Sequence, residues 1–569
     1  MKFVITPEYQ DLFDDSPELI EASISKVPLD VIVKICCYVN SQLYLNKSDE
    51  QLDLFILNTW LADQTIEART QILGKYKTYK TKNADYSAVI FSTHHVLGFL
   101  HDCIILNNNQ NDSTKDDFDP SYQLAALKMY VHGLNKRDAN INLEIAESTN
   151  FYHRNWPMMI GQDVLNTDAN YFNTLIKSMC FFDYFQFELG HDKEVKKFLE
   201  NTGCENGKNY AFKNLKLLQD VTNLVKPDGT RNFVFTPEEG LIPLYDTMSL
   251  NFKEYKSNHS ESKNFSGLKE FPLYKINGTN VFSVVDWNFF GNKIYSGLVF
   301  DFYNRSGLKN EKKNDFVNHY KPKVAEMIEK HLLAGLLKGV FEKENVVIQF
   351  DSRIDNHPDA YIRIGKRIFL IEIKDALFPA GAIESRSYDK IKSAIDEKYN
   401  SRNKGTGQII QQLQHLQLST FEDKTFEKLK IKRRNLIIYP IIIYTDSHFG
   451  LHGIGSYLNH EFSTKVDNEL SNTFGRISRL AFINIDFFIQ HFSALKNPKN
   501  RLDRLMDYYN QRIQKSEKDF LRHKTIEKDF EVHSDFEHIC HNQVYERSQS
   551  NDYVQEIFES LNLNRGVEP

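Results

Sequence analysis

The sequence predicts a mixed α+β protein in four parts, on three observations. Apolar residues recur at three- and four-residue spacing up to about residue 225, which favours helices. β-branched and aromatic residues alternate from about residue 271, and short apolar strands lie between helical segments from 316 to 446. The expected parts are a large helical N-terminal region (1–230), a small β-rich segment (231–305), an α/β core (306–460) and a helical C-terminal region (461–569).

The composition restricts the class of protein. The 569 residues are 41% hydrophobic, which excludes a disordered chain, and the net charge of −6 excludes a generally basic nucleic-acid coat. Any nucleic-acid surface must therefore be a local patch. No CxxC pair occurs, the first residues lack a signal-peptide apolar segment, and the longest apolar run, 436–444, is far shorter than the ~20 residues that cross a bilayer. We expect a soluble cytoplasmic protein without membrane contact.

The first two parts have clear local signals. Helical periodicity is strongest over Pro28–Leu45, Gln51–Tyr76, Tyr122–Leu134 and Tyr171–Phe187. In the β-rich segment, Phe271–Ile276 and Asn280–Val285 flank Asn277-Gly278, a dipeptide typical of hairpin turns. A further strand is expected over Ile294–Tyr303.

The α/β core is expected to begin with a helix from about Lys323 to Lys338, whose apolar residues form one stripe. Three strands, two helical segments and a long apolar strand follow: Val346–Phe350, Asp359–Ile364, Arg367–Ile373, Ser387–Lys398, Gly407–Leu418 and Asn435–Tyr444. Gly365-Lys366 predicts a tight antiparallel hairpin between the second and third strands. The order is therefore helix, three strands, helix, strand (αβββαβ).

Charged side chains are predicted to meet at one end of this hairpin. Glu372 and Lys374 end a strand of buried character, and alternation places both on one face with Ile373 opposite. The hairpin returns Asp359 to the same end. Two carboxylates beside an apolar sheet need a compensating partner, and Mg²⁺ is the natural one because it binds one or two carboxylates plus substrate phosphate. The alternative is a solvated cross-strand ion pair.

Pro358-Asp359, Glu372-Ile373-Lys374 and the elements around them resemble the PD-(D/E)XK nuclease superfamily, with its restriction-endonuclease-like core, over about 316–446. The resemblance implies a phosphodiesterase that depends on Mg²⁺, with Mn²⁺ able to substitute. It implies that Asp359, Glu372 and the Ile373 carbonyl bind the metal, while Lys374 orients or helps to deprotonate the attacking water. The chemistry agrees, because phosphodiester hydrolysis needs an activated water and neutralised charge.

Two further catalytic residues follow from the same resemblance. Many members of the superfamily carry a glutamate on the first core helix that faces the metal. Glu326 and Glu329 are the candidates in this chain, and we favour Glu329. A glutamine on the helix after the catalytic strands is similar to that of the RecB-like branch. Gln411 or Gln412 can take this role, and we favour Gln411.

Local basic residues provide candidate phosphate contacts. Gly405 and Gly407 lie at a predicted helix start, where backbone N–H groups can approach a phosphate, and residues 424–434 hold six Lys or Arg against one Glu. A second charged stretch, 496–528, is interleaved with aromatic residues. The predicted contacts are Lys404, Thr406, Lys430, Lys432, Arg433 and Arg434. The alternative for each is an ordinary solvated surface.

The first functional hypothesis is a metal-dependent endonuclease, with DNA favoured over RNA as substrate. A helical N-terminal half before such a nuclease resembles the architecture of bacterial restriction or antiphage effectors, which implies antiviral defence and a trigger or protein partner for that half. The alternatives are an RNA nuclease with the same metal chemistry, and a non-catalytic nucleic-acid-binding or scaffold subunit with a nuclease-like fold.

Overall fold

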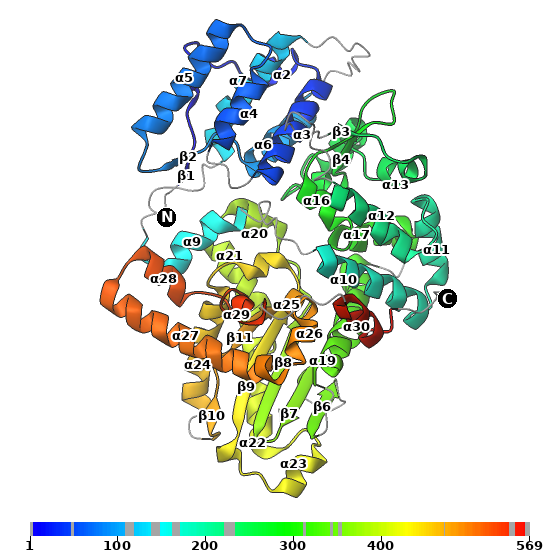
Figure 1. The fold of residues 1–569 in the computed structure, drawn as a ribbon, viewed down its shortest axis with the longest axis vertical. Coiled ribbons are helices and arrows are strands. Elements are labelled where there is room, and N and C mark those ends of the chain that lie inside the picture. The colour runs from blue at the N-terminus through cyan, green and yellow to red at the C-terminus, as the bar shows by residue number, and fades with distance from the viewer. Residues whose placement is uncertain are drawn as a thin grey trace. The chain divides into compact units, whose positions relative to one another are not determined.

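The computed structural model is a mostly helical α+β structure (Figure 1). It describes residues 4–46, 51–107, 119–137, 148–161, 171–220, 234–310, 315–341, 345–350, 356–470, 473–545 and 552–563. The chain divides into two compact units. The first comprises Met1–Asn142, Gly161–Leu175 and Lys193–Leu308, and the second comprises Leu143–Ile160, Ile176–Asp192 and Lys309–Pro569. The expected regions 1–230 and 231–305 therefore share one unit, apart from two helical insertions that belong with the core.

The first unit is formed mainly by short helices. Its elements are β1 (Val4–Ile5), α1 (Tyr9–Leu12), α2 (Ile20–Ile24), α3 (Leu29–Leu45), α4 (Leu52–Trp60), α5 (Ile66–Lys82), β2 (Ser87–Ala88), α6 (Thr93–Leu106), α7 (Pro120–Arg137), α11 (Asp192–Asn201), α12 (Gly207–Asp220), β3 (Val234–Phe235), η4 (Glu239–Leu241), α13 (Ile242–Asp246), α14 (Phe252–His259), α15 (Ser266–Glu270), β4 (Leu273–Lys275), β5 (Phe282–Val284), α16 (Trp287–Asn292), α17 (Ser296–Arg305) and η5 (Leu308–Asn310). Helix α10 (Tyr171–Asp183) begins in this unit and ends in the second.

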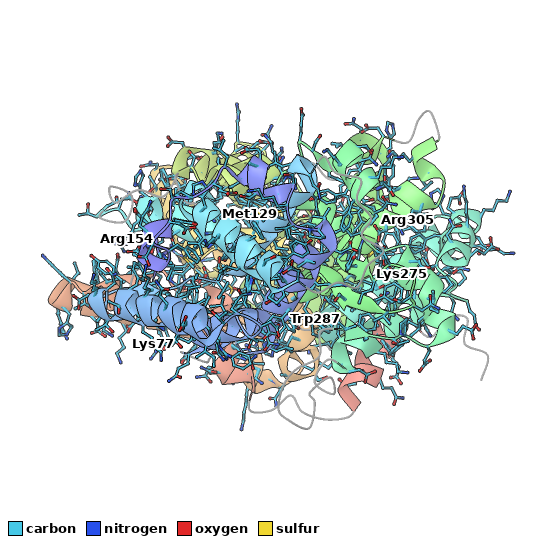
Figure 2. The ribbon with its side chains drawn as sticks, turned by 90° about the horizontal axis from the view of Figure 1, so that it is seen from above. Lys77, Met129, Arg154, Lys275, Trp287 and Arg305 are labelled. Atoms are coloured by element: carbon cyan, nitrogen blue, oxygen red, sulfur yellow. The ribbon has the colours of Figure 1, made fainter. Side chains whose placement is uncertain are left out.

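Helix α3 lies in the core of the first unit, against α6 and α7. Trp287, labelled in Figure 2, donates its indole N–H to the Ser41 hydroxyl at 3.1 Å and so ties α16 to α3. The predicted helices over 28–45 and 122–134 are confirmed. The predicted helix over 51–76 is instead two helices, because the chain turns after Trp60 and the Thr65 hydroxyl caps α5 by accepting the Ala68 N–H at 3.3 Å.

The β-rich segment contains a small three-stranded sheet in the order β3-β5-β4. Strands β4 and β5 form the predicted antiparallel hairpin, with Gly278 at a φ of 72° that suits glycine. The strand expected over 294–303 is wrong, because Ser296–Arg305 is helix α17. Its buried residues fall on one helical face, and there Asp301 accepts two hydrogen bonds from the buried Lys293 ammonium, at 2.9 and 2.7 Å.

The second unit contains the expected α/β core. Its elements are α9 (Phe151–Met159), η2 (Tyr184–Glu188), η6 (Phe316–Tyr320), α18 (Lys321–Glu326), η7 (Met327–Leu333), α19 (Ala334–Phe341), β6 (Val346–Phe350), β7 (Ala360–Ile364), β8 (Arg367–Lys374), α20 (Ala380–Ser385), α21 (Tyr388–Ile395), η8 (Asp396–Asn400), α22 (Thr406–Leu418), α23 (Lys424–Leu429), η9 (Arg433–Asn435), β9 (Ile437–Tyr444), η10 (Ser447–Gly450), α24 (Ile454–Glu469), β10 (Arg476–Ile477), β11 (Ala481–Asn484), α25 (Ile485–Gln490), α26 (Phe492–Leu495), η11 (Pro498–Asn500), α27 (Leu502–His523), α28 (Ile526–Val532), α29 (Phe536–Tyr545) and α30 (Asp552–Ser560).

A mixed sheet in the order β10-β9-β8-β7-β6 organises this unit, and β11 also pairs with β9 (Figure 1). Strands β6, β7 and β8 are antiparallel neighbours, whereas β9 runs parallel to β8. The four core strands are confirmed to within two residues at each boundary. The helix before them is also present, but it is longer than expected, because it begins at Lys321 and ends at Phe341. The predicted order of helix, three strands, helix and strand is present.

Helices cover both faces of this sheet. Leu370 and Ile442 point to the face on which α22 and α24 bury apolar residues such as Leu413. On the other face, Phe369 stacks on Tyr439 with ring centroids 5.1 Å apart. Helices α19 and α27 reach this second face through Phe341 on Phe369 and through Asp507, which accepts the Tyr439 hydroxyl.

The expected boundary between core and C-terminal region at 460/461 is wrong, because it falls inside α24. The C-terminal region is also not purely helical. Strand β11 pairs in parallel with β9, from Ala481 opposite Ile441 to Asn484 opposite Tyr444, and extends the core sheet. Four residues are too few to show a strand pattern, so this pairing depends on the tertiary structure.

A buried ion pair attaches α23 to the sheet. Arg363 on β7 and Asp423, the residue before α23, are 2% and 1% exposed, and a guanidinium N–H donates to the carboxylate at 3.0 Å. The same carboxylate accepts the Tyr361 hydroxyl at 3.1 Å and the Phe426 N–H at 2.9 Å. The Asp423 carboxylate therefore satisfies a buried guanidinium, a hydroxyl and a backbone N–H at the same time.

We expect Asp423→Ala to lower the free energy of unfolding by about 3–5 kcal/mol, because it leaves the Arg363 charge buried and unpaired. Chemical denaturation of the full chain measures this. Glu397→Ala is the control: it removes an exposed carboxylate paired with Lys398 at 2.6 Å and is expected to cost less than about 1 kcal/mol. Equal losses for the two variants would contradict the structural role of Asp423.

Candidate functional site

The predicted charged residues meet where β7 begins and β8 ends. Ala360 pairs with Ile371, so Asp359 lies one step further along, opposite Glu372. The Asp359 carboxylate accepts the backbone N–H of Ile373 at 2.8 Å. The short hairpin therefore fixes this carboxylate against the end of β8, as the sequence predicts.

The Lys374 ammonium lies between the two carboxylates. Its nitrogen is 2.9 Å from Glu372 Oε2 and 3.8 Å from Asp359 Oδ2. Glu372 is 0% exposed, whereas Lys374 and Asp359 are 23% and 18% exposed, so the cluster opens to solvent on the side of those two residues. The arrangement is a buried carboxylate with a second carboxylate and a cation at the protein surface.

Burial and neighbouring charges shift the pKa values of Glu372 and Lys374. Burial and the Asp359 charge raise the pKa of Glu372 to about 8, although Lys374 and Gln412 act in the opposite direction. Burial by itself lowers the pKa of Lys374, but the charges of Glu372, Asp359 and Glu329 outweigh it and raise that pKa. Lys374 is therefore cationic at neutral pH, whereas Glu372 mostly holds a proton there in the metal-free chain.

The two helix glutamates have different surroundings. Glu329 lies on the π-helical turn η7, is half-buried, and its charge acts on Lys374. Glu326 instead forms an exposed ion pair with Lys330 at 3.0 Å and raises the pKa of Tyr184. Single π-helical turns inside α-helices are frequent at functional sites.

The glutamine at the cluster is Gln412, and the choice of Gln411 is wrong. Gln412 is fully buried and donates its side-chain N–H to Glu372, while the Gln411 side chain donates to Asn403 at 3.1 Å. The periodicity of α22 contains the signal: Ile409, Leu413 and Leu416 are buried, and position 412 lies on the same inward face.

The glycines around α22 serve packing. A Cβ at Gly405, whose φ is 57°, would lie 2.1 Å from the Tyr399 carbonyl oxygen, and one at Gly407 would lie 2.3 Å from that of Ser401. Thr406 is fully buried, and its hydroxyl donates to Asn400 at 2.7 Å, so the predicted phosphate contact at Thr406 is wrong. Lys404 is exposed beside this turn.

The predicted basic patch lies at the far end of the sheet. Residues 430–434 precede β9, whose Ile437 pairs with Arg367, while Ile442 pairs with Glu372. Five steps along a strand separate the two ends by about 17 Å. Arg433 also donates to the Leu416 carbonyl at 2.7 Å. Lys430, Lys432, Arg433 and Arg434 therefore do not lie beside the carboxylates, and their contact with phosphate stays a prediction.

Sequence reasoning missed the support behind Lys374. The Tyr399 hydroxyl donates to the Lys374 carbonyl at 3.4 Å. The next residue, Asp375, pairs with Lys321 and accepts the Thr445 hydroxyl at 2.6 Å. The bond between Thr445 and Asp375 joins the segment after β9 to the segment after β8. The parallel pairing of β8 with β9 brings these two segments together.

The residues at the cluster fit a divalent cation. The neighbouring carboxyl groups of Asp359 and Glu372 and the unpartnered, fully buried Oε1 atom of Gln412 are groups that a cation with bound water would satisfy. Asp359, Glu372 and the Ile373 carbonyl are the candidate ligands. Over the residues that the structure describes, no set of three or more His, Cys, Asp or Glu side chains has metal-binding spacing. Mg²⁺ usually takes one or two protein carboxylates together with water and substrate phosphate.

Comparison of the chain with protein-family models, with curated proteins and with solved structures gave no match. Within the described ranges, no helix is both long enough and apolar enough to cross a membrane. All six cysteines lie in those ranges, are buried, and form no disulfide.

We expect the metal-free protein to lose stability as pH rises from about 4.5 to 8, by up to about 5 kcal/mol from Glu372. The raised pKa means that the folded chain holds a proton there which the unfolded chain has released, so this stabilisation is complete below pH 4.5 and lost by about pH 8. Denaturation in EDTA across this range measures it.

Glu372→Gln is the matched variant for this pH profile. Glu537, whose pKa burial raises to about 7, contributes a loss of the same sign in both proteins, so the difference between the two profiles isolates Glu372. Parallel profiles for wild type and Glu372→Gln would contradict the raised pKa.

Proposed function

We propose that the protein is a metal-dependent nuclease that hydrolyses phosphodiester bonds, with DNA as the preferred substrate. The observation that supports this most is the Lys374 ammonium 2.9 Å from Glu372 and 3.8 Å from Asp359 at one strand end. This is the set of groups that the PD-(D/E)XK resemblance implies, in the spatial relation that its chemistry needs.

In this proposal Asp359, Glu372 and the Ile373 carbonyl hold Mg²⁺. The bound cation would activate water and neutralise charge on the phosphate. Lys374 has a raised pKa and stays protonated, so it acts as a hydrogen-bond donor and a fixed positive charge toward the attacking water or phosphate. Gln412 holds the Glu372 carboxylate from behind, and Glu329 adds negative charge beside Lys374.

Two alternatives use the same geometry. An RNA nuclease would employ identical residues, and a non-catalytic nucleic-acid-binding subunit would keep them only as an ion-pair cluster. The complete set of Asp359, Glu372 and Lys374 favours an enzyme. The role in antiviral defence, and a trigger or protein partner bound by the N-terminal region, belong to the same proposal and rest on the resemblance in architecture.

We expect Lys374→Ala to reduce Mg²⁺-dependent cleavage at least about 100-fold, because it removes the positive charge nearest the reacting phosphate. The assay offers plasmid DNA, single-stranded DNA and tRNA, with Mg²⁺ or Mn²⁺. Lys366→Ala is the control, since Lys366 is an exposed lysine at the opposite end of the same hairpin, and it should cleave as the wild type does. Binding without cleavage by wild type on all substrates would favour the scaffold alternative.

We expect Gln412→Ala to weaken Mn²⁺ binding by about 10–100-fold, as loss of a group that holds a metal ligand commonly does. Titration calorimetry or Mn²⁺ electron paramagnetic resonance reads this without any substrate. Gln411→Ala, one residue away on the same helix and bonded to Asn403, should bind Mn²⁺ as the wild type does. Equal affinities for both variants would remove Gln412 from the site.

A further inference from the structure

The outward face of α27 carries a row of cations. Helix α27 spans Leu502–His523 and is the long orange helix of the second unit in Figure 1. At alternating spacings of four and three residues, one line along it holds Arg504, Tyr508, Gln511, Lys515, Lys518 and Arg522. Such spacing keeps side chains on one side of an α-helix. The opposite side packs into the protein through Leu505, Tyr509 and Ile513.

The four cations of this row are available to a ligand. Arg504, Lys515, Lys518 and Arg522 are all exposed, and none of their side chains forms a hydrogen bond or ion pair with another residue in the described ranges. No acidic residue lies on the row.

Three acidic residues of α27 lie near the row, and two of them form ion pairs with arginines outside the helix. Asp507 accepts Arg476 at 2.6 Å, Glu517 accepts Arg479 at 2.5 Å, and Asp519 flanks the row. Asp519 lies four residues after Lys515 and three before Arg522, spacings at which opposite charges attract on a helix. One nearby acid therefore opposes the four cations, and the row keeps a net positive charge in a chain whose net charge is −6.

Like charges at these spacings repel each other. Lys515 and Lys518 are three residues apart, and Lys518 and Arg522 are four apart, spacings at which like charges destabilise a helix by a few tenths of a kcal/mol per pair. A polyanion laid along the row would remove this repulsion and release its own counterions.

We propose that this row binds the phosphate backbone of double-stranded DNA. The helix from Arg504 to Arg522 extends over about 27 Å at 1.5 Å per residue, which equals about eight base-pair steps of 3.4 Å. A straight row of fixed charges matches a stiff duplex. Single strands are usually bound on several stacked aromatic rings, and Tyr508 is the only aromatic residue in the row.

The row on α27 is a DNA-binding surface that is separate from the proposed active site. Asp507 on α27 contacts Tyr439, whose ring lies on the sheet face opposite to the one that α22 covers, whereas Glu372 faces α22 through Gln412. The inference deepens the proposed function, because it names duplex DNA as the substrate form and assigns a contact that raises affinity. Loss of the row should raise KM and leave kcat unchanged.

The test measures binding of the full chain to a labelled 30-base-pair DNA by fluorescence anisotropy in EDTA, where no cleavage occurs. Lys515→Glu/Lys518→Glu should weaken binding at least tenfold at 100 mM salt. It should also lower the slope of log K against log salt by about 2, at ~0.9 for each phosphate that the variant no longer neutralises. The matched control is Lys193→Glu/Lys196→Glu on α11, which makes the same charge change at two exposed lysines of the first unit and should bind as the wild type does.

Four outcomes overturn the inference: an unchanged Kd and salt slope for Lys515→Glu/Lys518→Glu, an equal loss in the control double variant, a loss confined to single-stranded DNA, or a loss confined to an RNA hairpin. Cleavage with Mg²⁺ is scored separately on the same proteins. Wild type that binds through α27 but never cuts contradicts the proposed function and supports the row. Wild type that cuts while the double variant binds normally contradicts the row alone.

Discussion

The buried carboxylate of Glu372 is the constraint around which the second unit is arranged. An isolated charge with no solvent exposure is strongly unfavourable, so the fold must bring it a cation and hydrogen-bond donors. Lys374 is on the same face of the same strand, Gln412 comes from α22 packed on that face, and Asp359 comes from the neighbouring strand. Burial, together with the Asp359 charge, raises the pKa of Glu372 to about 8.

The two ends of the sheet have different roles. At one end, Asp359, Glu372 and Lys374 form the open charged cluster. At the other end, the charges are fully satisfied inside the protein: Arg363 and Asp423 attach α23 to β7. The same β7 face thus carries the carboxylate of Asp359 just before its start and a structural ion pair near its end, and Tyr361 between them bonds to Asp423.

The second unit also shows how a mildly acidic chain can present a surface for an anion. Its inner charges are paired at short range, as in Arg363 with Asp423 at 3.0 Å, whereas the outward row on α27 has no such partners among the described residues. Net charge therefore says little about local potential in this protein. The distribution of charge along one amphipathic helix decides where a polyanion can lie.

The sequence by itself determined the strands and the residues of the charged cluster. Alternation put Glu372 and Lys374 on one face, and the two-residue turn at Gly365-Lys366 brought Asp359 beside them, because both effects act over a few neighbouring residues. The spacing of apolar residues along α22 also indicated that position 412 faces inward, although we favoured Gln411 as the glutamine of the site. Local pattern failed at Ile294–Tyr303, where apolar residues suit either a strand or a helix and the buried pair of Lys293 and Asp301 accompanies the helix.

Only the tertiary structure decided which distant segments share a site. The parallel pairing of β9 with β8 sends residues 430–434 to the end of the sheet away from Glu372, and it recruits β11 from a region expected to be helical. The tertiary structure also distinguishes Glu326, which pairs with Lys330, from Glu329, whose charge acts on Lys374. Pairing between strands and the rotation of a helix depend on packing over many residues, and no local spacing in the chain specifies them.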